Sequence, residues 1–391
     1  MAVRHIVPNV HHVGVLDWDR RLFDKLIPLP QGTTYNSYVI QGSEKTAIID
    51  TVYPQKAEEL LANIKRLNLE KIDYIIASHG EQDHSGTAPI LLQMYPEAKI
   101  VTNNKCITSI MDMLMVDKDC FIEIKDGDTL SLGDKTLEFM ITPWVHWPDT
   151  MVTYLKEDKI LFTCDFFGSH LASSKMFAIE HEVYEPAKRY YAEIMMPFRK
   201  QIQRHIARIE PMDVSIIAPS HGPLYNNPKF IIDAYKDWVS DDVKNEVIIP
   251  YVSMYESTTK LVLHLTDQLM EKGVNVKPFN VTESDLGDFA VSVVDAATMV
   301  VGSSMVLSGA HPSIIPWVFM ANAIRPKIQY TSIIGSYGWG GNMIDQLNGL
   351  MAHIKSEPLE NIIVKGHPRP EDFIKIEALA NQIYEKHLPL M

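Results

Sequence analysis

The chain lacks the features of membrane, secreted and disulfide-stabilised proteins. Its 391 residues include only three cysteines, Cys106, Cys120 and Cys164, and their scattered positions argue against a disulfide framework. No two of them form a CxxC pair, so a zinc-ribbon module is absent. No apolar run reaches the length of a membrane span, and the first residues lack an apolar stretch of signal-peptide type. We therefore expect a protein of the reducing cytoplasm.

The chain also lacks an excess of positive charge. Lys and Arg number 36 against 49 Asp and Glu, which gives a net charge of −13. This balance disfavours nucleic acid and anionic membranes as partners, and favours small molecules or a basic protein patch. There is no internal repeat and no low-complexity segment. A hydrophobic content of 46% is ordinary for a globular protein, and the length suggests two domains.

Two patterns of secondary structure divide the chain near Asn245. Before this point, short β-rich runs alternate with turns and with an amphipathic helix over 54–67, which predicts an α/β sandwich. After it, strand, loop and helix alternate, which is typical of a doubly wound parallel sheet. We predict domains 1–245 and 246–391. The expected strands are 33–40, 46–52, 72–78, 98–102, 136–142, 150–155, 159–165, 247–252, 292–303 and 327–336.

The segment "SHGEQDHSG" follows the apolar run 72–78 and carries four metal-capable side chains. In an extended segment alternate side chains share a face, so His79, Glu81 and Asp83 would point into one pocket. His84 would point elsewhere, toward a second metal or a supporting role. Four ionisable groups within six residues crowd one another unless a cation holds them, so the segment predicts a metal site.

Three further apolar runs end in the same manner. His146 lies in a Trp-rich loop after 136–142, Asp165 ends 159–165, and His221 follows "SIIAPS". A carboxylate at the end of a buried strand is costly unless it is paired or bound to a metal. Taken singly, each residue is better explained as a satisfied histidine or a capping carboxylate. Their joint placement at the ends of four apolar runs favours a shared metal site.

The ligand chemistry narrows the choice of metal. Imidazole nitrogens combined with carboxylate oxygens, and no thiolate, suit iron or manganese better than structural zinc. Seven ligands suffice for two ions with open positions, and Asp165 is able to bridge them. The candidate metal ligands are His79, Glu81, Asp83, His84, His146, Asp165 and His221.

The motif H-x-E-x-D-H, followed by His146, Asp165 and His221, resembles that of the flavodiiron proteins, also called A-type flavoproteins. The segments "GTTYNSYVI", "HWPDTM" and "CDFFGS" are similar to this family as well, and the resemblance covers essentially the whole chain. It implies a metallo-β-lactamase-like αββα sandwich followed by a flavodoxin-like domain. The hydrolases of the metallo-β-lactamase superfamily carry H-x-H-x-D-H. Glu81 replaces the second histidine, which hardens the site and favours a redox-active iron pair over zinc.

The resemblance also implies how the ligands are shared and that no catalytic residue is needed beyond them. Some members have a His-Gly pair near the metal pocket, where this chain has Asp24 and Lys25. Asp149 and His170 are expected to support the site rather than bind metal. The implied ligand sets are His79, Glu81 and His146 for one iron, and Asp83, His84 and His221 for the other, with Asp165 bridging.

A second constellation follows the predicted strand 247–252. The segment "SMYESTTKL" opens a helix with hydroxyls and free backbone N–H groups, which together form a phosphate cradle. Alone, such a start is usually only an N-cap, but ligands of doubly wound sheets bind at the carboxyl ends of strands. With the loops 302–312 and 335–341 it resembles the three flavin loops of flavodoxin-like domains, which implies FMN. Glu256 stands where a glycine is common. The expected FMN contacts are Ser253, Met254, Tyr255, Ser257, Thr258, Ser304, Met305, Val306, Leu307, Gly309, Ser336, Tyr337, Gly338 and Trp339.

Two irons and FMN together imply an oxidoreductase that reduces O2 to water, NO to N2O, or both. Reducing O2 to two waters takes four electrons, of which the irons and the flavin each supply two. Reducing two NO to N2O takes two. Because the chain ends at Met391 without an added redox domain, we expect an external donor such as rubredoxin or reduced F420. The resemblance further implies a head-to-tail homodimer or a dimer of dimers.

Two other classes of function remain open from the sequence. The first is a hydrolase of the metallo-β-lactamase type with an accessory flavodoxin-like domain, against which Glu81 argues. The second is a non-catalytic electron-transfer flavoprotein with a structural metal site, against which the complete ligand set argues.

Overall fold

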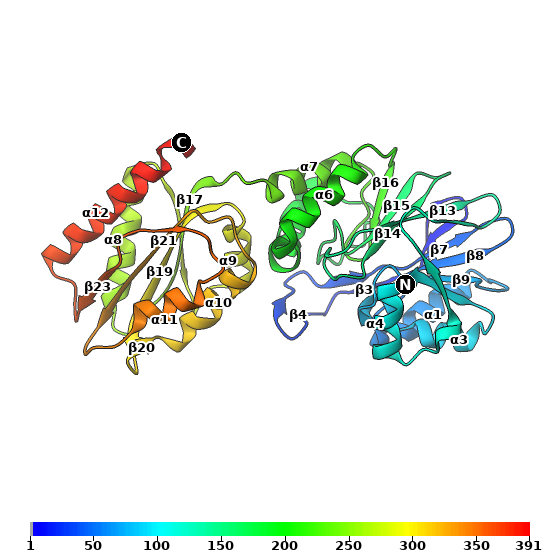
Figure 1. Cartoon of the computed structure of the whole chain (residues 1–391), viewed down its shortest axis with the longest axis horizontal. Coiled ribbons are helices and arrows are strands. Elements are labelled where there is room, and N and C mark those ends of the chain that lie inside the picture. Colours follow the sequence, from blue (N-terminus) through cyan, green and yellow to red (C-terminus); the bar gives the residue numbers. More distant parts are fainter. Residues whose placement is uncertain (1–2) are drawn as a thin grey trace. The chain divides into compact units, whose positions relative to one another are not determined.

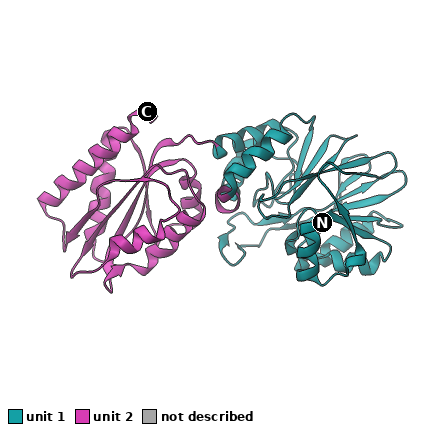
Figure 2. Ribbon diagram, viewed as in Figure 1, with its two compact units in different colours: residues 1–191, 198–239 teal, residues 192–197, 240–391 magenta. Residues whose placement is uncertain are grey.

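The computed structural model describes residues 3–391, which fall into two compact units (Figures 1 and 2). The first unit runs to Tyr191 and includes Phe198–Val239. The second comprises Ala192–Pro197 and Ser240–Met391. The expected domain boundary after Asn245 falls within strand β17 (Lys244–Val252), a few residues after the division between the units.

The first unit contains two main sheets. One has the order β1-β2-β7-β8-β9-β10-β11 and the other the order β12-β13-β14-β15-β16. Two small hairpins pair β3 (Val15–Asp17) with β6 (Thr33–Tyr35), and β4 (Leu22–Phe23) with β5 (Ile27–Pro28). The strands of the first sheet are β1 (Arg4–Val7), β2 (Val10–His12), β7 (Tyr38–Gln41), β8 (Thr46–Ile49), β9 (Tyr74–Ile76), β10 (Lys99–Asn103) and β11 (Phe121–Ile124). Those of the second are β12 (Thr129–Ser131), β13 (Thr136–Ile141), β14 (Met151–Leu155), β15 (Ile160–Cys164) and β16 (Ile216–Pro219).

Alternation along the strands explains why the sheets are covered on both faces. Ile48 and Ile75 join a core beneath the helices of the first sheet, whereas their neighbours Ile49 and Ile76 join a core between the two sheets. Phe139 of the second sheet completes the inner core. The result is an αββα sandwich, as expected. Its main helices are α1 (Ala57–Arg66), α2 (Gln82–Ser85), α3 (Ala88–Met94), α4 (Asn104–Leu114), α5 (Glu180–Tyr190), α6 (Arg199–Ile209) and α7 (Pro228–Val239).

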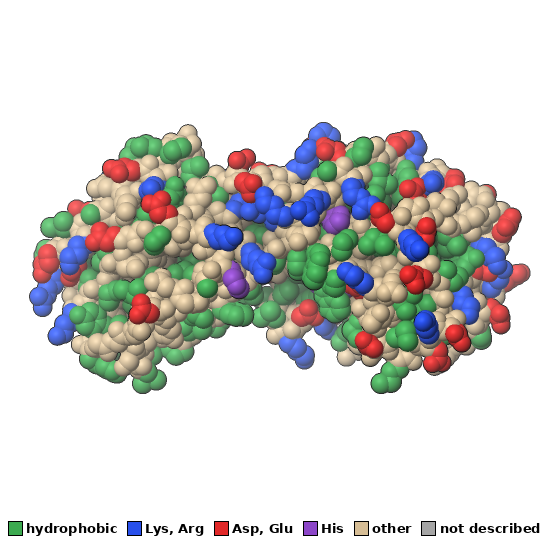
Figure 3. All heavy atoms as spheres, in the orientation of Figure 1, with side chains coloured by type: hydrophobic (Ala, Val, Ile, Leu, Met, Phe, Trp, Pro, Cys, Tyr) green, Lys and Arg blue, Asp and Glu red, His purple; other side chains and the backbone are tan. Residues whose placement is uncertain are grey.

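The second unit is a parallel sheet with helices on both faces. The strand order is β18-β17-β19-β21-β22, while β23 also pairs with β21, and the short β20 pairs antiparallel with β19. Acidic and basic side chains are interspersed over the face of this unit seen in Figure 3. Its other strands are β18 (Asn275–Asn280), β19 (Ala296–Val306), β20 (Gly309–Ala310), β21 (Tyr330–Tyr337), β22 (Glu357–Pro358) and β23 (Ile362–Lys365). Its helices are α8 (Ser257–Glu271), α9 (Leu286–Val293), α10 (Ile315–Ala323), α11 (Met343–Leu350) and α12 (Pro370–His387).

One predicted strand is wrong at its start. The apolar run 292–303 was expected to be extended throughout, but Ser292 and Val293 end helix α9, and strand β19 begins only at Ala296. Both the helix end and the strand are buried, so the hydrophobic pattern does not separate them. Over residues 3–391, none of the helices combines the length and apolarity required to span a bilayer.

Asn36 joins three segments of the first unit. Its side chain is 1% exposed, and its Nδ2 donates hydrogen bonds to the carbonyls of Pro219 at 2.8 Å and Gly222 at 2.7 Å. Its Oδ1 accepts from the Nε2 of His12 at 2.9 Å. The backbone on either side of His221 is therefore held by one amide from the turn between β6 and β7.

We expect Asn36→Ala to lower the free energy of unfolding of the first unit by about 2 kcal/mol, because buried polar partners lose their hydrogen bonds. Asn104→Ala, at an exposed helical position, serves as the control and is expected to change stability by under about 0.5 kcal/mol. Urea unfolding followed by tryptophan fluorescence measures both. Equal stabilities of the two variants would contradict the role of Asn36.

Candidate functional site

The seven candidate metal ligands come together at one edge of the αββα sandwich. His79 and Glu81 follow strand β9, and His146 lies in the loop after β13. Asp165 comes directly after β15, and His221 comes shortly after β16. Four strand ends therefore deliver these side chains to the same place, although they are far apart in the sequence. Asp83 and His84 reach it from the one-turn helix α2.

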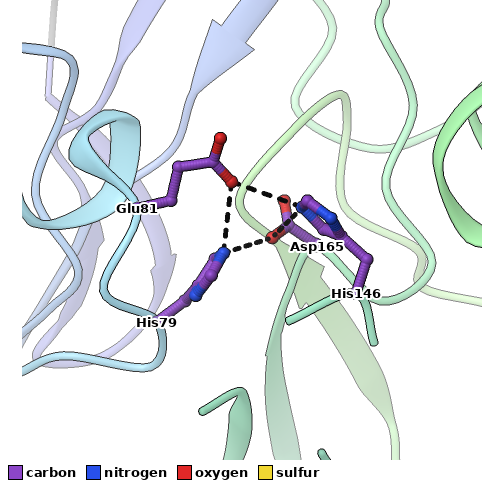
Figure 4. Close-up of side chains that lie close together, drawn as sticks. All are labelled: His79, Glu81, His146 and Asp165. Atoms are coloured by element: carbon purple, nitrogen blue, oxygen red, sulfur yellow. Dashed lines mark hydrogen bonds and ion pairs between the residues drawn. The ribbon is translucent and has the colours of Figure 1, made fainter. Parts of the chain in front are cut away.

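Four of the side chains form a first group, shown in Figure 4. Oε2 of Glu81 lies 3.2 Å from Nε2 of His79 and 3.3 Å from Nε2 of His146. Oδ2 of Asp165 faces the same two imidazoles, at 3.8 Å from His79 and 3.6 Å from His146. Two nitrogens and two carboxylate oxygens thus surround one small space.

A second group lies on the other side of Asp165. Nε2 of His221 is 3.1 Å from Oδ2 of Asp83, and Nε2 of His84 is 3.3 Å from Oδ1 of Asp83. Oδ1 of Asp165 is 3.2 Å from Nε2 of His84 and 3.4 Å from Nε2 of His221. The two oxygens of Asp165 therefore face different groups, which is the arrangement of a carboxylate placed between two cations.

The local conformation after β9 differs from the expectation. An extended segment would have directed His79, Glu81 and Asp83 into one pocket, but residues Gln82–Ser85 form helix α2. The helical turn places Asp83 with His84 and His221, apart from His79 and Glu81. The expectation of one shared face is wrong because the period of the backbone changes within the motif.

Several atoms of the second group are buried without a hydrogen-bond partner among residues 3–391. They are both carboxylate oxygens of Asp83 and Nε2 of His84. Nε2 of His84 lies 3.3 Å from Oδ1 of Asp83, yet the two are not oriented as donor and acceptor. Buried polar atoms usually have a partner, so this cluster has the chemistry of ligands for a cation.

Outer contacts determine which imidazole nitrogen faces the centre. Nδ1 of His79 donates to Oδ1 of Asp149 at 3.1 Å, and Nδ1 of His221 donates to the carbonyl of Thr34 at 2.6 Å. In both rings Nε2 is therefore left to point inward, as metal-binding histidines require. Asp149 takes the supporting position expected for it.

Tyr190 contacts Asp165, and His170 contacts His221. The hydroxyl of Tyr190 donates to Oδ1 of Asp165 at 2.8 Å, and the ring of His170 lies 5.1 Å from that of His221, between centroids. His170 bonds through Nδ1 to the hydroxyl of Thr33 at 2.9 Å. Sequence reasoning missed Tyr190, because nothing distinguishes a tyrosine on a helix face from a core residue.

The charges in the pocket balance one another. Burial alone would raise the pKa of Asp165, but the neighbouring imidazoles of His84 and His221 hold it well below its usual range. Burial would lower the pKa of His221, but hydrogen bonds and charge from Asp165 and Asp83 raise it to about 10. The raised pKa of His221 favours its protonated form beside these carboxylates, and a bound cation would take over that role and release the proton.

A cavity of about 480 Å³ opens beside Glu81 and includes Trp147 and Tyr35 in its lining. Asp24 and Lys25 also line it, from the tip of the β4–β5 hairpin, where both residues have positive φ (49° and 58°). Partial burial, together with the charges of Glu81 and Asp83, raises the pKa of Asp24 to about 6. Asp24 and Lys25 therefore face the cavity beside the candidate ligands Glu81 and Asp83.

The second unit has its own cavity, of about 320 Å³, at the carboxyl ends of its strands. Eight of the expected flavin contacts line it: Met254, Tyr255, Ser257, Ser304, Met305, Ser336, Tyr337 and Gly338. Thr258 lies beneath, with its hydroxyl 3.0 Å from that of Ser336.

Some expected contacts lie outside the cavity lining, and two lining residues were not expected. Ser253, Val306, Leu307, Gly309 and Trp339 do not line the cavity, and Leu307 and Trp339 are exposed at 86% and 64%. Gly366 and His367 do line it, from the loop after β23. The rule that ligands bind at the carboxyl ends of parallel strands would have indicated this fourth loop as well.

Glu256 has a left-handed backbone conformation. It precedes helix α8 with φ of +61°, a conformation that glycine adopts without steric cost. Its side chain is exposed, so the carboxylate lies at the solvent side of the cradle.

Comparison with known proteins connects both units to one family. Residues 33–222 match the family described as "ODP family beta lactamase". A nitric oxide reductase of Moorella thermoacetica is 33% identical, with 97% of each chain covered. A coenzyme F420H2 oxidase of Methanothermobacter marburgensis is 31% identical over 90% of each chain.

Solved structures agree. Rubredoxin oxygen:oxidoreductase from Desulfovibrio gigas superposes with a TM-score of 0.94 at 28% identity, covering 98% of both chains. The flavodiiron protein of Giardia intestinalis superposes with a TM-score of 0.93 at 26% identity, covering 99% of this chain and 97% of that one. The chain belongs to the flavodiiron protein family. The flavodiiron fold, a metallo-β-lactamase-like unit joined to a flavodoxin-like unit, confirms the fold class predicted from the sequence.

The flavodiiron motif places Gly80 between two of the candidate ligands, where there is no space for a side chain. A Cβ at this position would lie 2.6 Å from Cβ of Ser109 and 2.8 Å from Oδ2 of Asp149. We expect Gly80→Ala to destabilise the first unit by about 1–3 kcal/mol and to reduce the iron bound per chain, because Asp149 orients His79. Thermal unfolding and metal analysis measure the two effects.

Gly349→Ala is the matched control for this substitution. Gly349 lies in helix α11 with no heavy atom within 4 Å of an added Cβ. Alanine should therefore stabilise the second unit by up to about 1 kcal/mol and leave iron binding unchanged. Full iron binding by Gly80→Ala would contradict the steric argument.

Proposed function

We propose that the protein is a cytoplasmic flavodiiron oxidoreductase that reduces O2 to water, NO to N2O, or both. The observation that carries the proposal is the placement of Asp165, whose two carboxylate oxygens face two separate groups of imidazoles and carboxylates. A single cation would need only one such group. Two groups that share one carboxylate suit a pair of ions.

The proposed ligands follow from this placement. The buried, unpartnered oxygens of Asp83 and Nε2 of His84 fit a cation, and the mixture of nitrogen and oxygen donors fits iron. His84 belongs to the set because its Nε2 lies inside the second group. One iron is assigned to His79, Glu81 and His146, the other to Asp83, His84 and His221, and Asp165 bridges them.

When bound, the irons would supply redox-active positions for the gas, and FMN would supply electrons to them. The protein's own side chains hold the site in shape. Asp149 and the carbonyl of Thr34 keep the Nδ1 protons of His79 and His221, so that Nε2 stays free. The ring of Trp147 lies edge-on to that of His79, with centroids 4.8 Å apart, and limits the access of water to that imidazole.

FMN is assigned to the cavity at the carboxyl ends of the second unit's strands. Its small and hydroxyl-bearing lining suits a phosphate-bearing ring system, and relatives are named as flavin-dependent or flavodiiron proteins. Electrons would come from an external donor, either rubredoxin or reduced F420, because the names of relatives include both. The three free cysteines suit the reducing cytoplasm.

A head-to-tail homodimer, or a dimer of dimers, remains part of the proposal. In that arrangement the flavin of one subunit would lie near the irons of the other. The hydrolase alternative is weaker, because Glu81 takes the place of an imidazole and the relatives carry names of oxidoreductases.

Anaerobic stopped-flow mixing tests the proposal. The protein, loaded with iron and FMN and then reduced, is mixed with O2 or with NO, and flavin absorbance follows its reoxidation. Rapid reoxidation by at least one gas is expected. If neither gas reoxidises the flavin quickly, or if zinc-loaded protein hydrolyses esters or lactones instead, the proposal fails.

Asp165→Ala should remove the shared ligand and lower the iron content below two per chain, with at least a 100-fold slower reoxidation of the flavin by either gas, since ligand loss disturbs both positions. Asp112→Ala, at an exposed position of helix α4, is the control and should retain both iron and rate. Full iron and full rate in Asp165→Ala would disprove the bridging role.

A further inference from the structure

A pair of basic side chains stands at the rim of the flavin cavity. Nζ of Lys260, on the second turn of helix α8, lies 2.8 Å from Nε2 of His367. Nδ1 of His367 lies 3.4 Å from the hydroxyl of Ser257, the first residue of that helix. Ser257 and His367 both line the cavity. The pair therefore connects the fourth loop of the cavity to the start of α8.

The pair has no acidic partner in the part of the chain that the structure describes. Lys260 makes no ion pair with a carboxylate there, and its ammonium donates instead to an imidazole nitrogen. Lysine near a helix start is also in an unfavourable place, because the N-terminus of a helix carries partial positive charge. Exposed lysines normally avoid such a site, so an anion is the partner that would stabilise this arrangement.

A second observation indicates the same ligand. The hydroxyl oxygen of Ser253, at the end of β17 and the start of the same loop, is buried and has no hydrogen-bond partner among residues 3–391. Below the loop, the hydroxyl of Thr258 is satisfied by Ser336 and Ser304 at 3.0 and 3.4 Å. A hydroxyl without a partner beside free helix N–H groups is a donor available to an oxyanion.

Glu256 adds negative charge near the start of helix α8. Its exposed carboxylate belongs to the residue directly before the helix, and it lowers the positive potential that a phosphate group would meet there. Lys260 lies one helical turn further along and offsets that charge. The positive charge of Lys260 thus compensates the negative charge of Glu256 at this site.

The geometry points to Lys260 and His367 as the residues that bind the 5′-phosphate of FMN from outside the Ser/Thr loop. The inference rests on the proposed function, since it takes FMN as the occupant of the cavity. In it, Lys260 donates to a phosphate oxygen instead of to His367, His367 donates to the phosphate as well, and the hydroxyl of Ser257, which lines the cavity beside His367, adds a third hydrogen bond. The pair thereby distinguishes FMN from flavins that lack a phosphate.

Flavin titration of the full-length protein, freed of flavin, tests this inference. FMN and riboflavin are titrated separately, and quenching of flavin fluorescence gives each Kd. We expect Lys260→Ala and His367→Ala each to weaken FMN binding about tenfold, as for the loss of one charge-assisted hydrogen bond, and to leave riboflavin binding unchanged. Inorganic phosphate should compete with FMN but not with riboflavin.

Two further variants sharpen the result. Glu256→Gln should strengthen FMN binding and leave riboflavin binding unchanged. This effect on FMN is opposite to that expected for Lys260→Ala and His367→Ala. Lys355→Ala, an exposed lysine that precedes β22 and so lies near the amino end of β21, away from the carboxyl ends that form the cavity, should change neither. Thermal unfolding checks that every variant is folded.

The outcomes separate this inference from the proposed function. Equal loss of FMN and riboflavin affinity in Lys260→Ala and His367→Ala, or no loss of either, would overturn the phosphate contact while leaving FMN as the cofactor. If the unmodified protein binds neither flavin, the flavin assignment itself fails and this inference fails with it. A loss confined to FMN supports it.

Discussion

The structure of the first unit depends on keeping Asp165 ionised while it is buried. A carboxylate at the end of an apolar strand, 1% exposed, is unfavourable unless positive charge surrounds it. Imidazoles from three other segments surround it, at 3.2 to 3.8 Å from its two oxygens. Without these partners Asp165 would be an uncompensated buried charge, so electrostatics as well as packing joins the strand ends.

This constraint explains why the sandwich and the site belong together. The strands supply apolar residues to two cores by alternation, and the candidate ligands come at or after the points where strands β9, β13, β15 and β16 stop. Buried supports such as Asn36 then fix the loops that carry the ligands. The strands of the sandwich determine where the ligand-bearing loops begin. The loops and the short helix α2 determine which ligand side chains come into contact.

The second unit solves a related problem by other means. Its cavity is built from backbone ends and hydroxyls rather than from buried charge, and the polar residues Glu256, Lys260 and His367 lie exposed at the rim. A ligand that carries its own charge would meet this rim first. The first unit therefore buries its charged groups inside the site, whereas the second unit has its charged side chains exposed at the entrance of the cavity.

The sequence alone determined the α/β patterns of both units and the seven candidate ligands, because alternating apolar residues and strand-end polar residues are local patterns. Its resemblance to the flavodiiron family supplied the fold class and eight of the residues that line the cavity of the second unit. Only the tertiary structure decided how the ligands divide into two groups, since α2 changes the backbone period within a six-residue motif. Likewise, Tyr190 on α5 and His367 after β23 join their sites through contacts between segments distant in sequence, 25 and 110 residues from Asp165 and Ser257. Such contacts depend on packing, and no local pattern encodes them.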